Sequence, residues 1–146
     1  MLLSLFVCAG GAKGATIYQV EATNMTNVAV HDIHVAFTGT GGLLSGAMPL
    51  LPNNWTAGIT GGNIVDGDWN NTVTIGVGGT WRAQFSSELG GIVLAGGFWT
   101  DQNNQKVQGG DIPADKIKLT ELPEPNYFLA VFAAGSVLVM LRRLMA

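Results

Sequence analysis

The residues best able to do chemistry are the histidine and carboxylate side chains of His31-Asp32-Ile-His34. In an extended strand, side chains two positions apart point to the same side, so Asp32 and His34 share one face while His31 points to the other. A carboxylate beside an imidazole can begin a metal site or an acid–base pair. No third ligand is identifiable, and we favour a solvated strand face. A small hydrolase built on Asp32 and His34 is therefore our third hypothesis.

A second pattern of oxygen donors lies in Asp66-Gly-Asp68-Trp-Asn70. Every second residue offers a side-chain oxygen, as at the start of an EF-hand calcium loop. The stretch departs from that loop because Asn71 stands where glycine is required and Val77 where the final glutamate is required. A turn rich in Asx residues explains the same pattern. Asp66, Asp68 and Asn70 are thus candidate calcium ligands, and we expect no other cofactor.

The four tryptophans are Trp55, Trp69, Trp81 and Trp99. Aromatic planes exposed on a flat sheet can stack on sugar rings, whereas buried ones build a core. Trp81 alternates in step with Phe85, which indicates the core. Trp69 sits in a polar turn and is the best candidate for exposure, with Trp55 next. These two residues are the candidate glycan-binding side chains.

Several function classes lack support. The sequence contains no Ser-His-Asp or Gly-x-Ser-x-Gly arrangement and no Gly-rich loop that opens a helix to hold phosphate. Its formal net charge of −3 provides no basic surface for nucleic acid. Its one cysteine, Cys8, lies in the N-terminal apolar run, so no disulfide or cysteine site is expected in the domain that follows. We expect a protein that is not an enzyme.

Three matches to the N-glycosylation acceptor pattern begin at Asn24, Asn54 and Asn70. In a sequence this rich in Asn and Thr, such matches arise often by chance.

The composition favours strands over helices, because 21 glycines and frequent Asn and Thr accompany only 12% charged residues. Alternation and turn residues predict strands at 16–23, 28–38, 55–60, 63–65, 72–77, 80–87, 91–100 and 116–122. About eight short strands predict an all-β fold over residues 16–121. We expect a single antiparallel β-sandwich of immunoglobulin-like or jelly-roll-like type.

The connections are predicted from the same turn residues. The strands 16–23 and 28–38 are expected to pair as a hairpin, and the Gly-rich stretch 39–52 to cross between the sheets as a loop. Residues 66–71 are expected to form a turn, and residues 101–111 a long polar loop.

Both ends of the chain are predicted to be sorting segments. Residues 1–15 have the apolar run and small-residue stretch of a secretory signal peptide. At the other end, Pro123 and Pro125 hold the chain around Glu124 extended. Residues 127–141 then form an uncharged helix about 22 Å long, a short transmembrane span. Arg142 and Arg143 follow it and predict a cytoplasmic C-terminal side.

The order Pro123-Glu124-Pro125, apolar helix, Arg142-Arg143 resembles the PEP-CTERM sorting signal of Gram-negative bacteria. The resemblance covers residues 122–146 and implies that exosortase, a membrane protease-transpeptidase, cuts near Pro-Glu-Pro. It implies a precursor held transiently at the inner membrane and a product at the cell surface or outside the cell. It also implies a link to exopolysaccharide and biofilm. Our first hypothesis is therefore an exported, non-enzymatic cell-surface or extracellular-matrix protein.

The domain itself resembles bacterial cellulose-binding modules with an immunoglobulin-like sandwich. The residues that carry this resemblance are Ala22-Thr-Asn-Met-Thr-Asn27, His34-Val-Ala-Phe37, Asn54-Trp55-Thr56, Asp68-Trp69-Asn70 and Val77-Gly-Gly-Thr-Trp-Arg-Ala-Gln-Phe85. Those modules bind polysaccharide with a flat row of exposed tryptophans. The resemblance implies our alternative hypothesis, a carbohydrate-binding module that uses Trp69 and Trp55.

Overall fold

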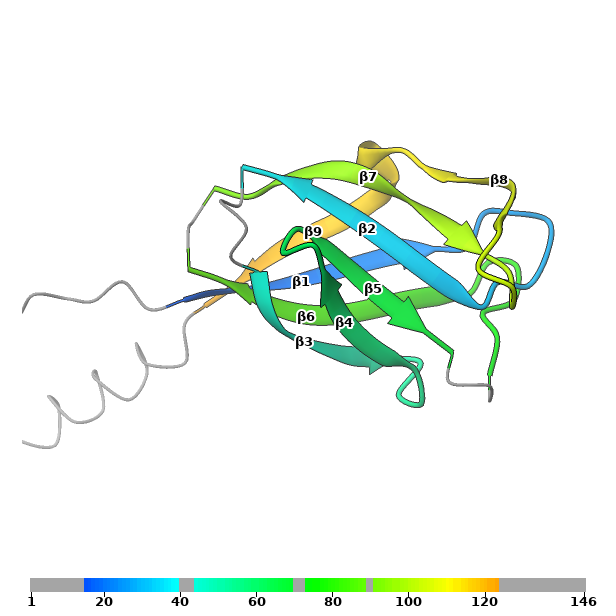
Figure 1. The fold of residues 1–146 in the computed structure, drawn as a ribbon, viewed down its shortest axis with the longest axis horizontal. Helices are drawn as coiled ribbons and strands as arrows, with labels where there is room; N and C mark the ends of the chain where they lie inside the picture. The colour runs from blue at the N-terminus through cyan, green and yellow to red at the C-terminus, as the bar shows by residue number, and fades with distance from the viewer. Residues whose placement is uncertain (1–14, 40–43, 70–72, 89–90, 124–146) are drawn as a thin grey trace, which may run out of the picture.

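A computed structural model describes residues 15–39, 44–69, 73–88 and 91–123 of the chain (Figure 1). These residues form strands and one short 3-10 turn. The strands are β1 (Thr16–Thr23), β2 (Asp32–Thr38), β3 (Leu44–Leu51), β4 (Thr56–Thr60), β5 (Ile64–Asp68), β6 (Thr80–Ser87), β7 (Val93–Thr100), β8 (Lys106–Ile112) and β9 (Ile117–Leu122), and the turn η1 (Ala114–Lys116) lies between β8 and β9. The predicted all-β fold is confirmed.

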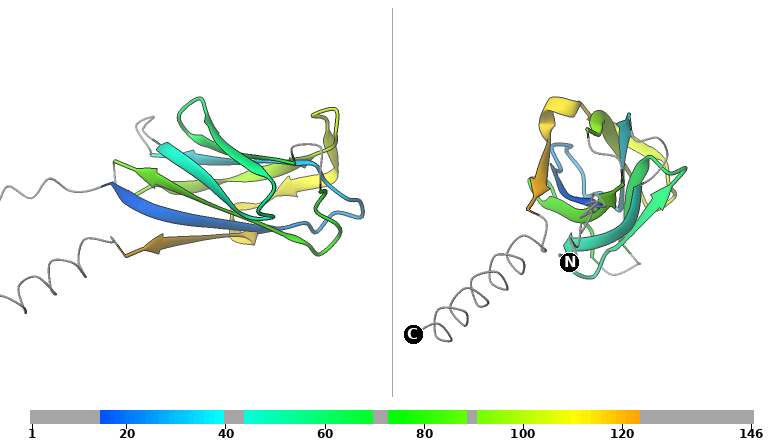
Figure 2. Two further views of the ribbon diagram at one scale, coloured as in Figure 1. Left: turned by 90° about the horizontal axis from the view of Figure 1, so that it is seen from below. Right: turned by 90° about the vertical axis from the view of Figure 1, so that its left-hand side faces the viewer.

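The strands form two sheets that pack face to face (Figure 2). One sheet has four strands in the order β3-β6-β1-β9, and the other has five in the order β4-β5-β2-β7-β8. Every strand pairing among the described residues is antiparallel. The predicted antiparallel sandwich is therefore confirmed. In the part of the chain that the structure describes, no helix is long and apolar enough to cross a membrane, and the predicted span 127–141 lies outside that part.

The core forms where the inward faces of the two sheets meet. In β1 and β6 alternate side chains are buried, among them Val20, Trp81 and Phe85. In the other sheet, Ile33 and Val35 of β2 are buried in the same core. Alternation of buried and outward side chains is what a strand with one covered face requires. The outward residues of β2 are therefore available for a site.

The predicted hairpin between the first two strands is wrong, because β1 and β2 lie in different sheets. Residues 24–31 carry the chain across the sandwich and are fixed by side-chain hydrogen bonds. Asn24, fully buried, donates from Nδ2 to the carbonyls of Val28 and Ile75. β1 and β2 each bury their apolar face against the other sheet. The chain therefore crosses from one sheet to the other and does not form a hairpin.

Two strands occupy stretches predicted to be loops. β3 lies within the predicted loop 39–52, and β8 lies largely within the predicted loop 101–111. Both are edge strands with irregular pairing, and β3 contains Gly46 and Pro49. Edge strands tolerate proline and bulges because one side of the strand needs no partner, so the usual alternation is lost.

Two further predictions are wrong in the middle of the chain. Asp66 and Asp68 lie within strand β5 and do not form a turn. Of the predicted strand 72–77, the described residues 73–77 form only an isolated bridge between Ile75 and Val30. The strands at 16–23 and 80–87 are confirmed with the predicted bounds.

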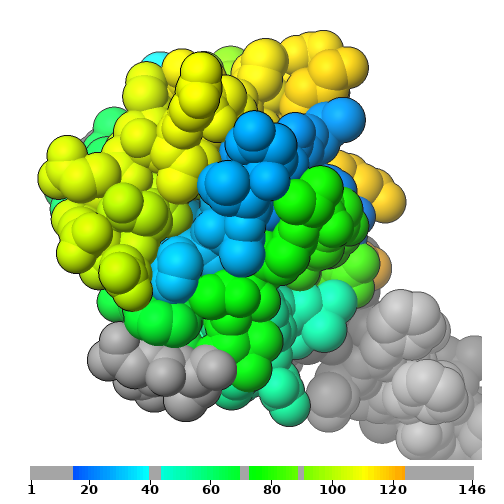
Figure 3. Space-filling model, turned by 90° about the vertical axis from the view of Figure 1, so that its right-hand side faces the viewer, coloured from blue at the N-terminus to red at the C-terminus, as the bar shows by residue number. Residues whose placement is uncertain are grey.

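The sandwich has two ends, which we call the terminal pole and the distal pole. β1 begins and β9 ends at the terminal pole, because Ile17 pairs with Leu122. The distal pole carries the start of β2 and the ends of β5 and β7, because Asp32 pairs with Asp68 and with Thr100. It lies on the right in Figure 1 and faces the viewer in Figure 3.

Candidate functional site

The candidate site lies on the outer face of the five-stranded sheet, toward the distal pole. Cross-strand pairing sets His34 of β2 between Asp66 of β5 and Phe98 of β7. One step along, Asp32 faces Asp68. These side chains point outward because the residues between them, such as Ile33 and Gly67, are buried.

His34 is held by carboxylates on both sides of its ring. Its Nδ1 lies 2.6 Å from Asp66 Oδ1, and its Nε2 lies 3.1 Å from Asp32 Oδ2. These hydrogen bonds, first to Asp32 and then to Asp66, raise the pKa of His34 to about 10 against the opposing effect of burial. At neutral pH His34 is therefore an imidazolium whose two N–H groups both donate to carboxylates.

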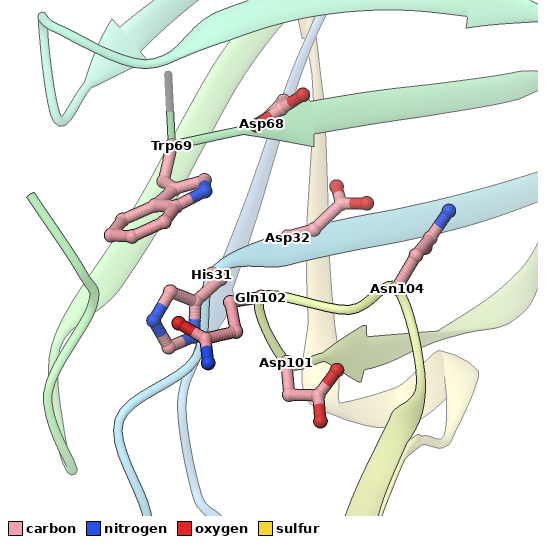
Figure 4. Close-up of a pocket in the computed structure, with 7 residues that line it drawn as sticks. All are labelled: His31, Asp32, Asp68, Trp69, Asp101, Gln102 and Asn104. Carbon is pink, nitrogen blue, oxygen red and sulfur yellow. The ribbon is translucent and has the colours of Figure 1, made fainter. Parts of the chain in front are cut away.

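A polar hollow of about 300 Å³ opens beside this row at the distal pole; we call it the distal hollow (Figure 4). It is lined by Asp32, Asp68, Asp101, Gln102 and Asn104 and by the rings of His31 and Trp69. The two rings meet edge to face, with centroids 4.3 Å apart and planes at 86°. The hollow thus combines hydrogen-bond acceptors with an aromatic wall.

The loop after β7 shapes one side of the distal hollow. Asp101 Oδ1 accepts hydrogen bonds from the backbone N–H groups of Gln105 and Asn103, both at 2.9 Å. These bonds lower the pKa of Asp101 because they stabilise its carboxylate. Asn104 follows with φ 60°, and its Oδ1 lies 3.4 Å from His34 Nε2. The loop is therefore fastened to the His34 row.

A second hollow of about 320 Å³ lies further along the same face; we call it the Phe98 groove. His34 and Phe98 stand at its side, with ring centroids 4.6 Å apart. Its lining is mainly apolar and includes Ala36, Ile64 and Pro113. Two hollows of different polarity thus adjoin His34 and its carboxylate partners.

The sequence candidates are only partly brought together. Asp32 and His34 are in contact as predicted from their spacing, and Asp66 supplies the third group that the sequence did not reveal. Asp66 and Asp68 lie on a strand, so the predicted calcium turn is not formed, and Asn70 lies outside the described residues. Within the described ranges, no group of three or more His, Cys, Asp or Glu residues is arranged to hold a metal ion. Calcium binding itself stays a prediction.

The predicted exposure of Trp55 is wrong. Trp55, Trp81 and Trp99 are each at most 2% exposed, and the Trp55 indole N–H donates to the carbonyl of Val73. Burial of the large apolar ring in the core stabilises the fold more than its exposure at the surface would. Trp69 is partly buried and lines the distal hollow. Sequence reasoning also missed Phe98, whose outward position depends on the pairing of β7 with β2.

Most predicted sorting residues lie outside the described part of the chain. Only Pro123 falls within it, exposed directly after β9. Glu124, Pro125, Arg142 and Arg143 fall beyond it.

Comparison of the chain with protein-family models, with curated proteins and with solved structures finds no match.

Proposed function

We propose that the chain is a non-enzymatic, exported cell-surface or extracellular-matrix protein, sorted through its C-terminal segment. The observation that carries the proposal is where the domain ends. β9 ends at Leu122, and Pro123-Glu124-Pro125 follows at once. The sandwich is thus complete before the resembled PEP-CTERM motif, so cleavage there would release an intact domain.

The orientation of the domain supports the same proposal. The first and last strands meet at the terminal pole. The predicted signal peptide at 1–15 and the predicted membrane span at 127–141 would therefore both attach at this pole. The distal hollow lies at the opposite pole. A protein held by its tail at the inner membrane presents this hollow away from the membrane.

A non-enzymatic role fits the chemistry of the His34 cluster. An imidazolium that donates from both nitrogens to carboxylates has no lone pair with which to accept a proton. Among the described residues that line the distal hollow there is no serine, threonine or cysteine to act as nucleophile.

The sorting proposal is tested in cells with and without exosortase. We expect a shorter, released protein only in cells that contain the enzyme, measured by intact mass and by fractionation. A Glu124→Ala variant should stay at precursor size and in the membrane fraction, whereas a Glu121→Ala control in β9 should be processed normally. Equal size and equal membrane retention in both cell types would refute the proposal.

A second candidate function is carbohydrate binding by an immunoglobulin-like sandwich. It is favoured by the distal hollow, where the Trp69 ring stands beside carboxylate and amide acceptors. Sugar rings present C–H faces to aromatic planes and hydroxyl donors to such acceptors. The link to exopolysaccharide implied by the C-terminal resemblance points the same way.

The carbohydrate proposal is tested by titrating the protein with soluble neutral polysaccharides in a calorimeter. Trp69→Ala should weaken binding about tenfold, because the aromatic contact is worth about 1 kcal/mol or more. Met25→Ala removes a side chain that is 76% exposed on a distal loop and should leave binding unchanged. Equal affinities for all three proteins would exclude Trp69 from the site.

A further inference from the structure

We propose that the outer face of the five-stranded sheet binds an extended chain of neutral sugar units, with the Phe98 groove as a second subsite beside the distal hollow. The inference rests on the carbohydrate-binding candidate above and names its ligand class and its second contact. Neither the resemblance to cellulose-binding modules nor the tryptophan pattern includes Phe98.

The groove is built by an irregularity in β7. Ala36 pairs with Gly96, but the next residue, Phe37, pairs with Leu94, so Ala95 is an extra residue in the ladder. Gly96 has φ 126°, a conformation that other residues rarely adopt. Bulges of this kind bend a strand and re-aim the side chains around them. The groove is shallowly lined by the small residues Ala36, Gly96 and Gly97. The larger side chains of Phe98 and Ile64 form its sides.

Phe98 is held ready for a ligand. Its residue is 36% exposed, yet its ring lies 4.6 Å from the His34 ring with 32° between their planes. His34 is itself fixed between Asp32 and Asp66. A cation beside an aromatic face adds attraction to this contact. The exposed ring therefore loses little conformational freedom when a sugar stacks on it.

The two hollows lie along one strand. Asp32 lines the distal hollow, whereas His34 and Ala36 line the groove. From Asp32 to Ala36, four residues of β2 at about 3.3 Å each span about 13 Å. A single sugar ring occupies one hollow at a time, whereas a chain of several rings reaches both.

The charges on this face favour a neutral ligand. Asp32, Asp68 and Asp101 line the distal hollow and repel an anionic polymer. The groove is mainly apolar, and its charged lining residues are one cation, His34, and one carboxylate, Asp111, so it offers no net charge to an ionic polymer. A neutral chain with hydroxyl donors and C–H faces suits both hollows.

The test is chain-length dependence. The full chain in mild detergent is titrated with β-linked gluco-oligosaccharides of one to six units. We expect affinity to rise about tenfold or more between two and six units, as the second subsite becomes filled. Phe98→Ala should remove this rise and leave the affinity for the shortest sugars unchanged. Phe98→Tyr keeps the ring and should keep the rise.

The matched control is Val93→Ala, which shortens another exposed apolar side chain of β7, 58% exposed, outside both hollows. It should behave as the unaltered protein. Circular dichroism melting checks that each variant is folded. Phe98→Leu, which removes the aromatic ring but keeps an apolar side chain, should also remove the rise and carries the test if Phe98→Ala is not folded.

The outcomes separate the two proposals. If no oligosaccharide binds at any length, the carbohydrate function itself fails. If sugars bind but affinity is independent of length, or if the length effect survives in Phe98→Ala, only the second subsite fails. Tighter binding of glucosamine oligomers than of neutral ones would overturn the neutral ligand class.

Discussion

Asn24 ties the distal loops to the core by using its whole amide group. Its Nδ2 donates to Val28 and Ile75 carbonyls at 2.8 and 3.0 Å, and its Oδ1 accepts from the N–H and Oγ1 of Thr26. The side chain is fully buried. Although Asn24-Met-Thr26 matches the glycosylation acceptor pattern, its amide is enclosed and cannot receive a glycan in the folded protein.

Replacing Asn24 should destabilise the domain strongly. Asn24→Ala leaves buried carbonyl and hydroxyl groups without their partners, at a cost of about 2 to 4 kcal/mol. Urea unfolding followed by tryptophan fluorescence measures the change. Asn27→Ala, at an exposed position in the same loop, is the control and should change stability by less than about 0.5 kcal/mol. Equal effects of the two variants would show that the amide network contributes nothing.

His34 should make the free energy of unfolding fall as the pH becomes alkaline. Its pKa is raised from 6.5 to about 10 by Asp32 and Asp66, so the folded state holds a proton that the unfolded chain releases above pH 6.5. The stabilisation is complete below pH 6.5 and is lost as pH rises toward 10. After allowance for solvent screening of a side chain that is 21% exposed, we expect a loss on the order of 1 to 2 kcal/mol between pH 6 and pH 9.

The measurement is urea unfolding at several pH values in this range. His34→Gln should abolish the slope, because no proton is bound between the carboxylates. His31→Gln keeps the His34 cluster and should keep the slope. A slope that persists in His34→Gln would assign it to another group.

At the scale of the elements, Gly67 lets β5 pack directly on the tryptophan core. A Cβ at this position would lie 2.2 Å from Trp81 Nε1 and 2.9 Å from Ile33 Cγ2. Trp81 is fully buried in the core, where side chains are closely packed. The outward position of Asp66 and Asp68 therefore depends on a glycine between them.

We expect Gly67→Ala to cost about 1 to 3 kcal/mol through overpacking. Gly58→Ala on the neighbouring strand β4 is the matched control, because a Cβ there meets nothing within 4 Å. The control should be neutral or slightly stabilising. Melting temperatures of the two variants test the difference, and similar temperatures would contradict the close packing of Trp81 on β5.

The whole molecule should fold without either of its predicted sorting segments. β1 starts at Thr16, β9 ends at Leu122, and the two strands pair along their length. A fragment of residues 16–122 contains no cysteine, and it includes the nine strands that the structure describes. We expect it to unfold cooperatively, with a melting temperature that is insensitive to reducing agent.

A fragment that ends at Ile112 provides the contrast. It lacks β9 and so uncovers Val20 and Ala22 at the edge of the four-stranded sheet. It should not unfold cooperatively in the same scan. A cooperative transition in the shorter fragment would show that β9 is dispensable.

The sequence by itself determined the all-β class, the sandwich and the bounds of β1 and β6. Strict alternation of apolar and polar residues on a half-buried strand is a local property of the sequence. It is clearest in a strand that has a neighbouring strand on each side. The same logic placed Asp32 and His34 on one face. The apolar, proline-flanked C-terminal segment is likewise a local pattern, and its sorting role stays a prediction.

Only the tertiary structure decided how these pieces meet. Which sheet β2 joins, and that Asp66 and Phe98 flank His34, depend on pairing between strands far apart in the chain. The edge strands β3 and β8 were not predicted, because a strand with one free edge need not alternate apolar and polar residues strictly. Trp55 went to the core because burial of its ring outweighs its polar neighbours in sequence. Periodicity reveals which way a side chain points, whereas long-range pairing decides what it meets.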